Sequence, residues 1–465
     1  MFLGWRPDGS FVRLGPNLHR DLEPRNQILI QSRPVTNDSS STSARLLKTH
    51  QKHSIKATEE TEKSAPIFTL PKSIKHRSER FNQSLFDALE EYSSAECDFN
   101  SATQQVVSSS FSLLISLYGD DMSSGSGSIS ESCRQEAVTI WLQQVIKAID
   151  LGDAASVSSN IYGSIFTALS RGDTTTASSL ALDGGNPHLS LMLSNTGVQA
   201  QPFCDGWDVQ STSSDILRIV CAATGSIDVE RNRVRRNVSD IDWRRYFCLL
   251  LGLCSNSDDQ ATLSSIIKQY GSDVSADLAP PAMPLYCDKL YRARISTTAT
   301  NQCILYQILN HYADAKVPLT GILAPSSHSP CKHDFSASFH LGASLTAISR
   351  STLKHHQENL ITDAVTSQLI GEGQWEWAVY ASLCFIGGGI VSGPTAFAKQ
   401  LAAKKIISMF YSPSTDSSAE SRRSFLQNLG IPSEWFIEAH THRCISQEDF
   451  FAMAKDPQIT TMEHA

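Results

Sequence analysis

Residues 353–386 read LKHHQENLITDAVTSQLIGEGQWEWAVYASLCFI, and this stretch decides the fold class. Its first half repeats apolar residues three and four positions apart, which is the spacing of one helix face: Leu360, Ile361, Ala364, Val365 and Leu369. Gly371 and Gly373 then end this helix, as glycine does at a helix C-terminus. Residues 374–386 are apolar on nearly every side, which is typical of a helix buried inside a larger helical assembly. The stretch contains no catalytic group, so it predicts an all-α scaffold.

Helical periodicity extends in both directions from this stretch. The predicted helices cover residues 81–92, 106–118, 131–151, 154–170, 174–182, 187–193, 214–224, 240–253, 255–270, 300–314, 334–350, 394–409 and 422–429, and a last helix starts near Pro432. Their spacing is irregular, which argues against a strict repeat family such as the tetratricopeptide repeat. No strand is expected after Val35.

The first 35 residues follow a different pattern. Pro7-Asp8-Gly9 is a turn sequence, since proline presets one backbone dihedral and glycine accepts a positive one. The apolar residues on both sides of this turn predict a β-hairpin, and residues 26–35 (NQILIQSRPV) supply a third short strand. Three short strands cannot build a core of their own. The segment is therefore either a disordered tail or a set of strands that completes another protein's sheet.

The remaining chain divides into three parts by composition. Residues 36–79 are predicted to be a disordered linker, because serine, threonine and lysine crowd them and hydrophobic residues are few. Residues 67–70 (IFTL) form a short apolar anchor inside this linker. The α-helical block is expected at residues 80–444, and residues 445–465 form a weakly ordered C-terminal end.

The overall composition argues against several classes of protein. The net charge of -8 and the pI of about 6.0 disfavour direct nucleic-acid binding, because phosphate contacts need a basic surface. No apolar run approaches the ~20 residues of a membrane span, so no membrane insertion is expected. Residues 1–20 lack the apolar core of a signal peptide. The 11 cysteines contain no C-x-x-C pair, and their odd number favours free thiols in a nuclear or cytosolic protein.

Three clusters carry residue types that are used in catalysis or binding, and each has a simpler explanation. His333-Asp334 is a dipeptide that ligates metal in some phosphohydrolases, but here Asp334 is better placed to cap a helix N-terminus. Residues 440–444 (HTHRC) put two histidines on different faces of one helix, where they cannot share a metal. Residues 231–236 (RNRVRR) read as a solvated basic face. Since no phosphate-binding or nucleophile-elbow glycine motif occurs either, the sequence predicts no enzyme, no metal site and no cofactor.

Several short motifs resemble, in the same order along the chain, those of the Nuclear protein 96 family of outer-ring nucleoporins. Residues 368–378 (QLIGEGQWEWA) are similar to that family's QLES-GLWEWAIF stretch. The other similar motifs are residues 4–9 (GWRPDG), 188–194 (HLSLMLS), 217–219 (LRI) with 241–245 (IDWRR), 339–345 (FHLGASL) and 430–439 (GIPSEWFIEA). Each motif is only moderately specific, but the ordered set runs from residue 4 to about residue 444.

The resemblance implies a particular architecture, the ancestral coatomer element. This is an elongated α-helical solenoid block that folds back on itself into a trunk and a crown. Its N-terminal strands add a blade to a Sec13-like β-propeller, a role that would fall here on Gly4, Trp5, Phe11, Val12, Ile28 and Ile30. The core of the helical block is expected to include Trp243, Leu369, Trp375, Trp377 and Trp435.

The resemblance also implies partners and a location. The crown of family members packs against a related helical nucleoporin of the Y-complex, in the nuclear pore complex at the nuclear envelope. A role of this kind supports protein import and mRNA export. The chain has fewer residues before Gly4 and after the last motif than the family pattern, and no counterpart of the precursor's self-cleaving domain, so no peptidase activity is expected.

Two alternatives stay open from the sequence. The first is a vesicle-coat scaffold subunit of the Sec31 or Sec16 kind, which shares the helical element but carries a propeller or a proline-rich region in the same chain. The second belongs to a different class, an α-helical metal phosphohydrolase built on His333-Asp334.

Overall fold

The computed structural model describes most of the expected helical block and parts of the N-terminal region. The described residues are 4–5, 11–12, 42–58, 64–71, 79–94, 101–123, 131–152, 160–195, 214–224, 242–255, 261–276, 278–284, 286, 302–329, 331–348, 351–388, 390–411 and 417–446. The expected third strand at residues 26–35, the basic residues 231–236 and the C-terminal residues 447–465 lie outside them.

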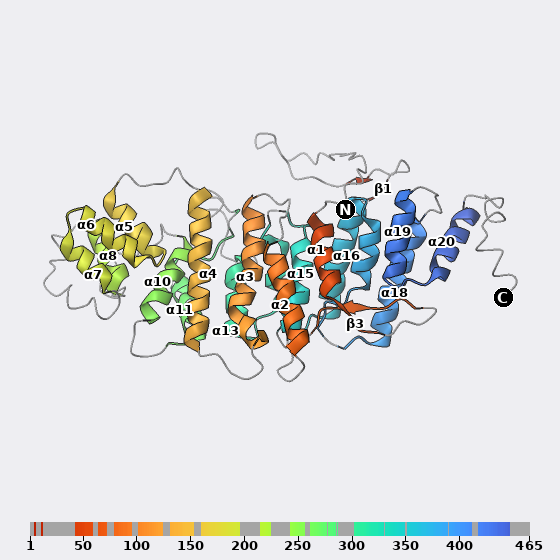
Figure 1. Ribbon diagram of the computed structural model, residues 1–465, viewed down its shortest axis with the longest axis horizontal. Coiled ribbons are helices and arrows are strands. Elements are labelled where there is room, and N and C mark those ends of the chain that lie inside the picture. The colour runs from red at the N-terminus through yellow and green to blue at the C-terminus, as the bar shows by residue number, and fades with distance from the viewer. Residues whose placement is uncertain are drawn as a thin grey trace. The chain divides into compact units, whose positions relative to one another are not determined.

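Helices make up most of the described chain, so the predicted all-α class is confirmed (Figure 1). The chain divides into two compact units, one formed by Met1–Gln104 with Leu323–Ala465 and the other by Gln105–Ile322. Unit 1 contains α1 (Thr42–His53), α2 (Glu79–Ser94), η4 (Pro325–Ser327), α15 (Ser336–Ile348), α16 (His355–Gly371), α17 (Trp375–Leu383), α18 (Gly393–Phe410), α19 (Ser417–Asn428) and α20 (Ser433–Ser446). Unit 2 contains most of α3 (Ser101–Ser123), α4 (Glu131–Gly152), α5 (Ile161–Ser170), α6 (Thr174–Asp183), α7 (Pro187–Ser194), α8 (Ser214–Thr224), α10 (Trp243–Ser255), α11 (Leu263–Ser275), α13 (Ile304–Ala313) and α14 (Leu319–Ile322).

The stretch at residues 353–386 forms two helices at the centre of unit 1, as its pattern predicts. The first helix, α16, ends at Gly371, and Gly373 adopts a φ of 76°, a conformation that glycine reaches without steric cost. The second helix, α17, is followed directly by buried residues, so that every residue from 378 to 386 is buried. The burial of α17 from Ala378 onward follows from its lack of a polar face.

The prediction of a disordered linker at residues 36–79 is wrong for the described residues 42–58 and 64–71. Residues 42–53 form α1, in which Leu46 and Leu47 are buried, and the anchor residues Ile67, Phe68 and Leu70 are buried as well. Helical structure therefore begins well before residue 80. The few apolar residues of this segment suffice because helices from the other end of the chain supply the rest of the core.

The segment also contains strands, which corrects the expectation that none follows Val35. β3 (Ile55–Lys56) pairs antiparallel with β4 (Phe68–Thr69), with Lys56 opposite Phe68. On the other side of β4, Phe68 forms a parallel bridge with Cys384 at the end of α17. The hairpin thereby joins an N-terminal segment to a C-terminal one through backbone hydrogen bonds.

Unit 1 is thus built from both ends of the chain. The red α1 lies beside the orange α2 and the teal α15, although α15 starts only at Ser336 (Figure 1). The chain leaves this unit after α2 and returns to it before α15. This return is the fold-back that the resemblance implied.

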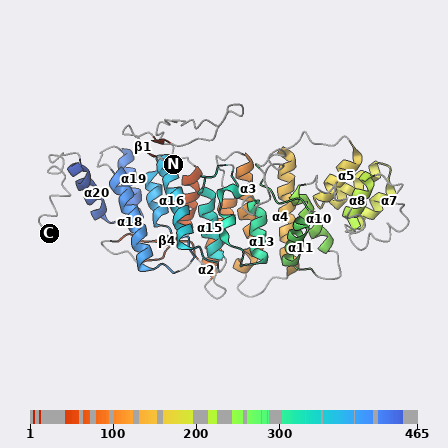
Figure 2. The same cartoon turned by 180° about the vertical axis from the view of Figure 1, so that it is seen from behind.

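Unit 2 packs α4 against α10 and α11, which lie side by side in both views (Figure 2). Its core contains an aromatic cluster in which the ring centroids of Tyr270 and Tyr306 are 5.0 Å apart and those of Trp243 and Tyr306 are 6.1 Å apart. The buried guanidinium of Arg244 lies 4.9 Å from the Trp243 ring and bonds both carboxylate oxygens of Asp242. A buried cation is tolerated here because it has both an aromatic face and a carboxylate.

Among the described residues, no helix has the length and apolar content that crossing a membrane requires.

The packing of α1 predicts a specific cost for truncating its core. Leu47→Ala should lower the free energy of unfolding by about 2–5 kcal/mol, because it removes a buried side chain and leaves a cavity. Urea titration followed by circular dichroism measures this change. Lys48→Ala, at the neighbouring exposed position, is the matched control and should change stability by less than about 0.5 kcal/mol. Equal, small effects of both substitutions would show that α1 is not packed.

Candidate functional site: the seam of unit 1

The residues proposed to bind a propeller lie partly in a described hairpin. Gly4 and Trp5 form β1, Phe11 and Val12 form β2, and the two strands pair antiparallel with Gly4 opposite Val12 and Trp5 opposite Phe11. This pairing agrees with the turn that the sequence predicts between them. Residues 28 and 30, both isoleucine, lie outside the described residues, and donation of these strands to another protein stays a prediction.

The structure places the five expected core residues as follows. Trp243, Leu369, Trp375 and Trp435 are buried. Trp377 is half-buried, and its ring centroid lies 4.7 Å from that of Phe425 in α19. This position makes Trp377 a contact between α17 and α19.

The residues weighed for metal binding do not assemble into a site. His333 is exposed, and Asp334 accepts hydrogen bonds from the N–H and the hydroxyl of Ser336 at the start of α15. His440 is buried whereas His442 is exposed, so the two lie on different faces of α20. Throughout the described ranges, no three His, Cys, Asp or Glu side chains are grouped as metal ligands would be.

A buried polar seam that the sequence did not indicate holds α1 in place. His50 Nδ1 lies 3.1 Å from the Tyr92 hydroxyl, and His340 Nδ1 lies 3.3 Å from the same oxygen. The Tyr380 hydroxyl donates to Ser54 Oγ at 3.1 Å. These residues come from α1, α2, α15, α17 and the turn after α1, so the seam joins four helices.

Burial keeps both seam histidines neutral. Desolvation, with a smaller contribution from His53, lowers the pKa of His50 from its usual value to about 3. Desolvation and the neighbouring His50 lower the pKa of His340 well below its usual value. Among the described residues, the Nε2 atom of His50 has no hydrogen-bond partner, so a proton there would sit on a buried nitrogen without an acceptor.

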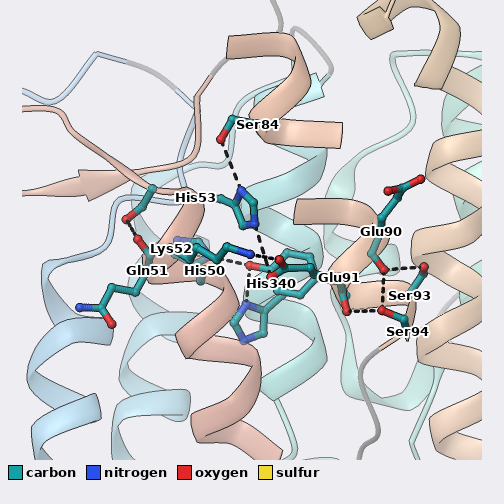
Figure 3. Close-up of polar contacts among 12 residues, drawn as sticks. His50, Gln51, Lys52, His53, Ser84, Glu90, Glu91, Ser93, Ser94 and His340 are labelled. Atoms are coloured by element: carbon teal, nitrogen blue, oxygen red, sulfur yellow. Dashed lines mark hydrogen bonds and ion pairs between the residues drawn. The ribbon is translucent and has the colours of Figure 1, made fainter. Parts of the chain in front are cut away.

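The outer edge of the seam is a cluster between α1 and α2 in which His53 is buried and Lys52 is exposed. Figure 3 shows His53 between Ser84 and Glu91, with Lys52 also directed at the Glu91 carboxylate. The hydrogen bond from Lys52 is the main cause that lowers the pKa of Glu91. Because the Lys52 and Glu91 side chains are exposed, this cluster contributes little to stability compared with the buried part.

Residues 64–71 extend the seam toward α18. The Phe385 N–H donates to the Phe68 carbonyl at 2.7 Å, and Gln400 Nε2 of α18 donates to the Ala65 carbonyl at 2.7 Å. The rings of Phe68 and Tyr380 have centroids 5.2 Å apart. Residues 64–71, which were predicted to lie in a linker, therefore form hydrogen bonds with two C-terminal parts of the chain, Phe385 and α18.

A buried ion pair lies at the end of this seam, next to the C-terminus of α17. Lys399 Nζ of α18 lies 3.0 Å from a carboxylate oxygen of Glu358 in α16 and donates to the Cys384 carbonyl at 2.7 Å. The side chains of Lys399 and Glu358 are 7% and 1% exposed, so neither charge is solvated by bulk water. The pair ties α16 and α18 together across the end of α17.

The contacts of the seam hold α1, α2, α15, α16, α17 and α18 against one another. His50 and His340 are buried and neutral, and Lys399 and Glu358 are buried and paired with each other. Sequence reasoning missed the seam because α1 carries only two leucines in 12 residues, and a short helix with few apolar residues resembles a linker. A weak signal was the spacing of Leu46, Leu47 and His50 on one helical face.

Comparison with known proteins connects this architecture to one family. The model of the family described as Nuclear protein 96 matches residues 163–443, which is more than half of the chain. Nuclear pore complex protein NUP96 of Arabidopsis thaliana is 23% identical over 326 residues, which cover 66% of this chain and 29% of that protein. The chain therefore spans less than a third of the length of this curated relative.

The buried histidines predict acid-sensitive stability. Their pKa values in the folded state lie below the ~6.5 of an unfolded histidine, so on acidification protons bind first to the unfolded chain. The two histidines therefore do not reduce the free energy of unfolding above about pH 6.5, and they reduce it progressively as the pH decreases toward 3. His50→Gln should reduce the slope of unfolding free energy against pH, between pH 6 and 5, by about 1.4 kcal/mol per pH unit.

Urea titrations at several pH values measure this slope. Tyr92→Phe is the matched control, because it removes the shared hydroxyl but no group that titrates in this range. It should lower stability by a similar amount at each pH and leave the slope unchanged. A slope that His50→Gln does not alter would contradict the burial of His50.

The Lys399–Glu358 pair predicts a strongly non-additive double mutant. Glu358→Gln should destabilise by about 3–5 kcal/mol, because it leaves the Lys399 charge buried without its partner. Glu358→Gln combined with Lys399→Met should recover most of this loss, as measured by urea titration. Lys404→Met, which breaks an exposed pair with Glu438, is the control and should cost less than about 1 kcal/mol. Additive effects at 358 and 399 would mean that the pair is solvated.

Proposed function

The chain belongs to the Nuclear protein 96 family, and from that premise we propose that it is a structural nucleoporin of the nuclear pore complex, located at the nuclear envelope. The observation that carries this proposal is the family match over residues 163–443, which includes helices of both units. The relative from Arabidopsis thaliana, whose name states that it is a nuclear pore complex protein, supports the same role. Within the pore, we assign the chain to the scaffold of the outer ring, the Y-complex.

The described structure fits the physical demands of a scaffold. A scaffold must keep its shape while neighbours bind to its surface, which requires a well-packed core with few alternative arrangements. The seam of unit 1 and the aromatic cluster around Tyr270 in unit 2 both provide such packing. The proposed mechanism is therefore architectural and involves no catalysis and no cofactor. Support of protein import and mRNA export would follow from holding the pore together.

The N-terminal hairpin fits a role in strand donation. An isolated two-stranded hairpin is marginally stable in water, and β1 and β2 each contain two residues. Such strands gain stability when they join a larger sheet, since main-chain hydrogen bonds and alternate side chains then both find partners. A Sec13-like open β-propeller is the partner that we assign to residues 1–35.

The other proposed partners are helical nucleoporins of the Y-complex, which would pack against the crown. Direct nucleic-acid binding is not part of the proposal, because the net charge of -8 repels phosphate. Insertion into the membrane is not part of it either.

The proposal predicts a complex that depends on the N-terminal strands. Co-expressed with the Sec13-like propeller of the same organism, the full chain should elute with it as one complex in size-exclusion chromatography. Replacing Trp5, Phe11 and Ile28 by Asp should abolish co-elution, because each would place a charge in a sheet interface. Replacing Asn17, His19 and Asn37 by Asp adds the same number of acidic side chains at polar positions outside the three predicted strands and should leave the complex intact. Circular dichroism should report the same helicity for all three proteins.

Fluorescent tagging of the chain in cells separates the candidate assemblies. A continuous signal at the nuclear rim supports the nuclear pore scaffold. A signal confined to sites of vesicle formation would replace it with a coat subunit of the Sec31 or Sec16 kind. Co-elution that survives the Trp5, Phe11 and Ile28 substitutions would rule out strand donation, whatever the location.

A further inference from the structure

One helix of unit 1 carries an apolar ridge that no described element covers. Along α18, Phe397 is 66% exposed, Leu401 is 57% exposed and Met409 is 58% exposed. With the exposed Lys405, these residues follow one another at intervals of four, so they form a single ridge on the helix surface. We call these four residues the α18 ridge.

The opposite face of α18 is fully used inside the unit. Lys399, Ala403, Ile406 and Ile407 are buried, and α18 packs against α17 and α20. The α18 ridge therefore points away from the core. Its residues form a separate exposed face and are not the margin of the buried face. Elsewhere in the described chain, the large exposed apolar side chains do not form a ridge of this length along one helix.

The shape of this surface suits another helix. Pro394, Ala398 and Ala402 are exposed and also lie four residues apart, so a row of small side chains runs beside the ridge. The large side chains form a ridge and the small ones form a groove beside it. A second helix can place its own ridge in such a groove, with the helix axes crossing at about 50°. Contiguous exposed apolar surface of this kind marks an interaction site in soluble proteins.

The charges on α18 indicate the charge of a partner that would bind to it. The helix contains three lysines and neither Asp nor Glu. Lys399 is paired with Glu358 and Lys404 with Glu438, whereas Lys405 in the ridge has no ion-pair partner among the described residues. A second copy of the same ridge would bring only positive charge to this surface, so charge complementarity favours an acidic partner over self-association.

We propose that the α18 ridge is the docking surface for an amphipathic α-helix of another subunit, whose apolar stripe packs on Phe397, Leu401 and Met409 and whose Asp or Glu pairs with Lys405. This inference rests on the proposed scaffold function, because it assigns one face of unit 1 to a neighbour in the assembly. A membrane surface is a poorer occupant, since helices that bind membranes surround their apolar face with several exposed basic residues and this ridge offers one.

Photo-crosslinking in cells tests the proposal. The photoreactive residue p-benzoylphenylalanine replaces Leu401 in the full-length tagged chain, and mass spectrometry identifies the crosslinked peptide. The matched control carries the same residue at Leu360 of α16, which is 60% exposed and has the exposed polar residues His356, Asn359 and Asp363 near it on the helix. The expected result is a peptide from a different protein, obtained from position 401 but not from 360, with apolar residues three and four apart and with Asp or Glu.

A synthetic peptide of the crosslinked sequence then tests the chemistry on the purified full chain. Leu401→Glu should weaken its binding about tenfold or more, and Leu360→Glu should not. Lys405→Glu should also weaken binding, and exchanging the acidic residue of the peptide for Lys should restore it. Binding that is insensitive to Lys405→Glu would overturn the assigned ion pair.

Four other outcomes overturn the proposal. They are crosslinks from position 401 to this same chain, crosslinks to a second copy, no yield above the Leu360 control, and sedimentation of the chain with phosphatidylserine vesicles that Leu401→Glu abolishes. Localisation at the nuclear rim is scored independently in the same cells. A rim signal without the expected crosslink rejects only the docking surface. If the wild-type chain gives no rim signal, the scaffold function itself is rejected.

Discussion

The hydroxyl of Tyr92 holds the imidazoles of His50 and His340 at hydrogen-bonding distance in a place closed to solvent. The three residues belong to α2, α1 and α15, so this single contact fixes three helices against one another. Burying polar groups costs free energy unless each finds a partner, and here the partners exist only when all three helices are in place. The contacts of unit 1 therefore need residues from both sides of unit 2 in the sequence.

The same constraint extends along the segment that follows α1. The backbone hydrogen bond from Phe385 to Phe68 and the side-chain hydrogen bond from Gln400 to Ala65 attach this segment to the residues after α17 and to α18. The pair of Lys399 and Glu358 then ties α18 to α16. Apolar packing alone tolerates shifts between helices, whereas buried polar contacts are satisfied in one register only. This is the kind of packing that a structural protein needs in order to present its surfaces at fixed positions.

Unit 1 differs between its interior and its surface in how apolar side chains are covered. Inside, the helix with the most uniform apolar character, α17, is buried from Ala378 to its end. At the outside, α18 pairs or buries two of its lysines but leaves an apolar ridge in solvent. Contiguous exposed apolar surface marks interaction sites in soluble proteins, so the exposed ridge is informative in a way that a buried leucine is not.

By itself, the sequence determined the all-α class and most helix positions, because apolar periodicity and the glycine at residue 373 act within a few residues of one another. It also determined the family, through ordered motifs around Trp243, Trp375 and Trp435. Only the tertiary structure decided that residues 42–58 and 64–71 contribute side chains to the core. Their two leucines and short apolar run are too few to form a core locally, and they gain stability only against α15, α17 and α18, which lie hundreds of residues away. The histidine seam was hidden for the same reason, since no local pattern links His50 to His340 before the chain folds back.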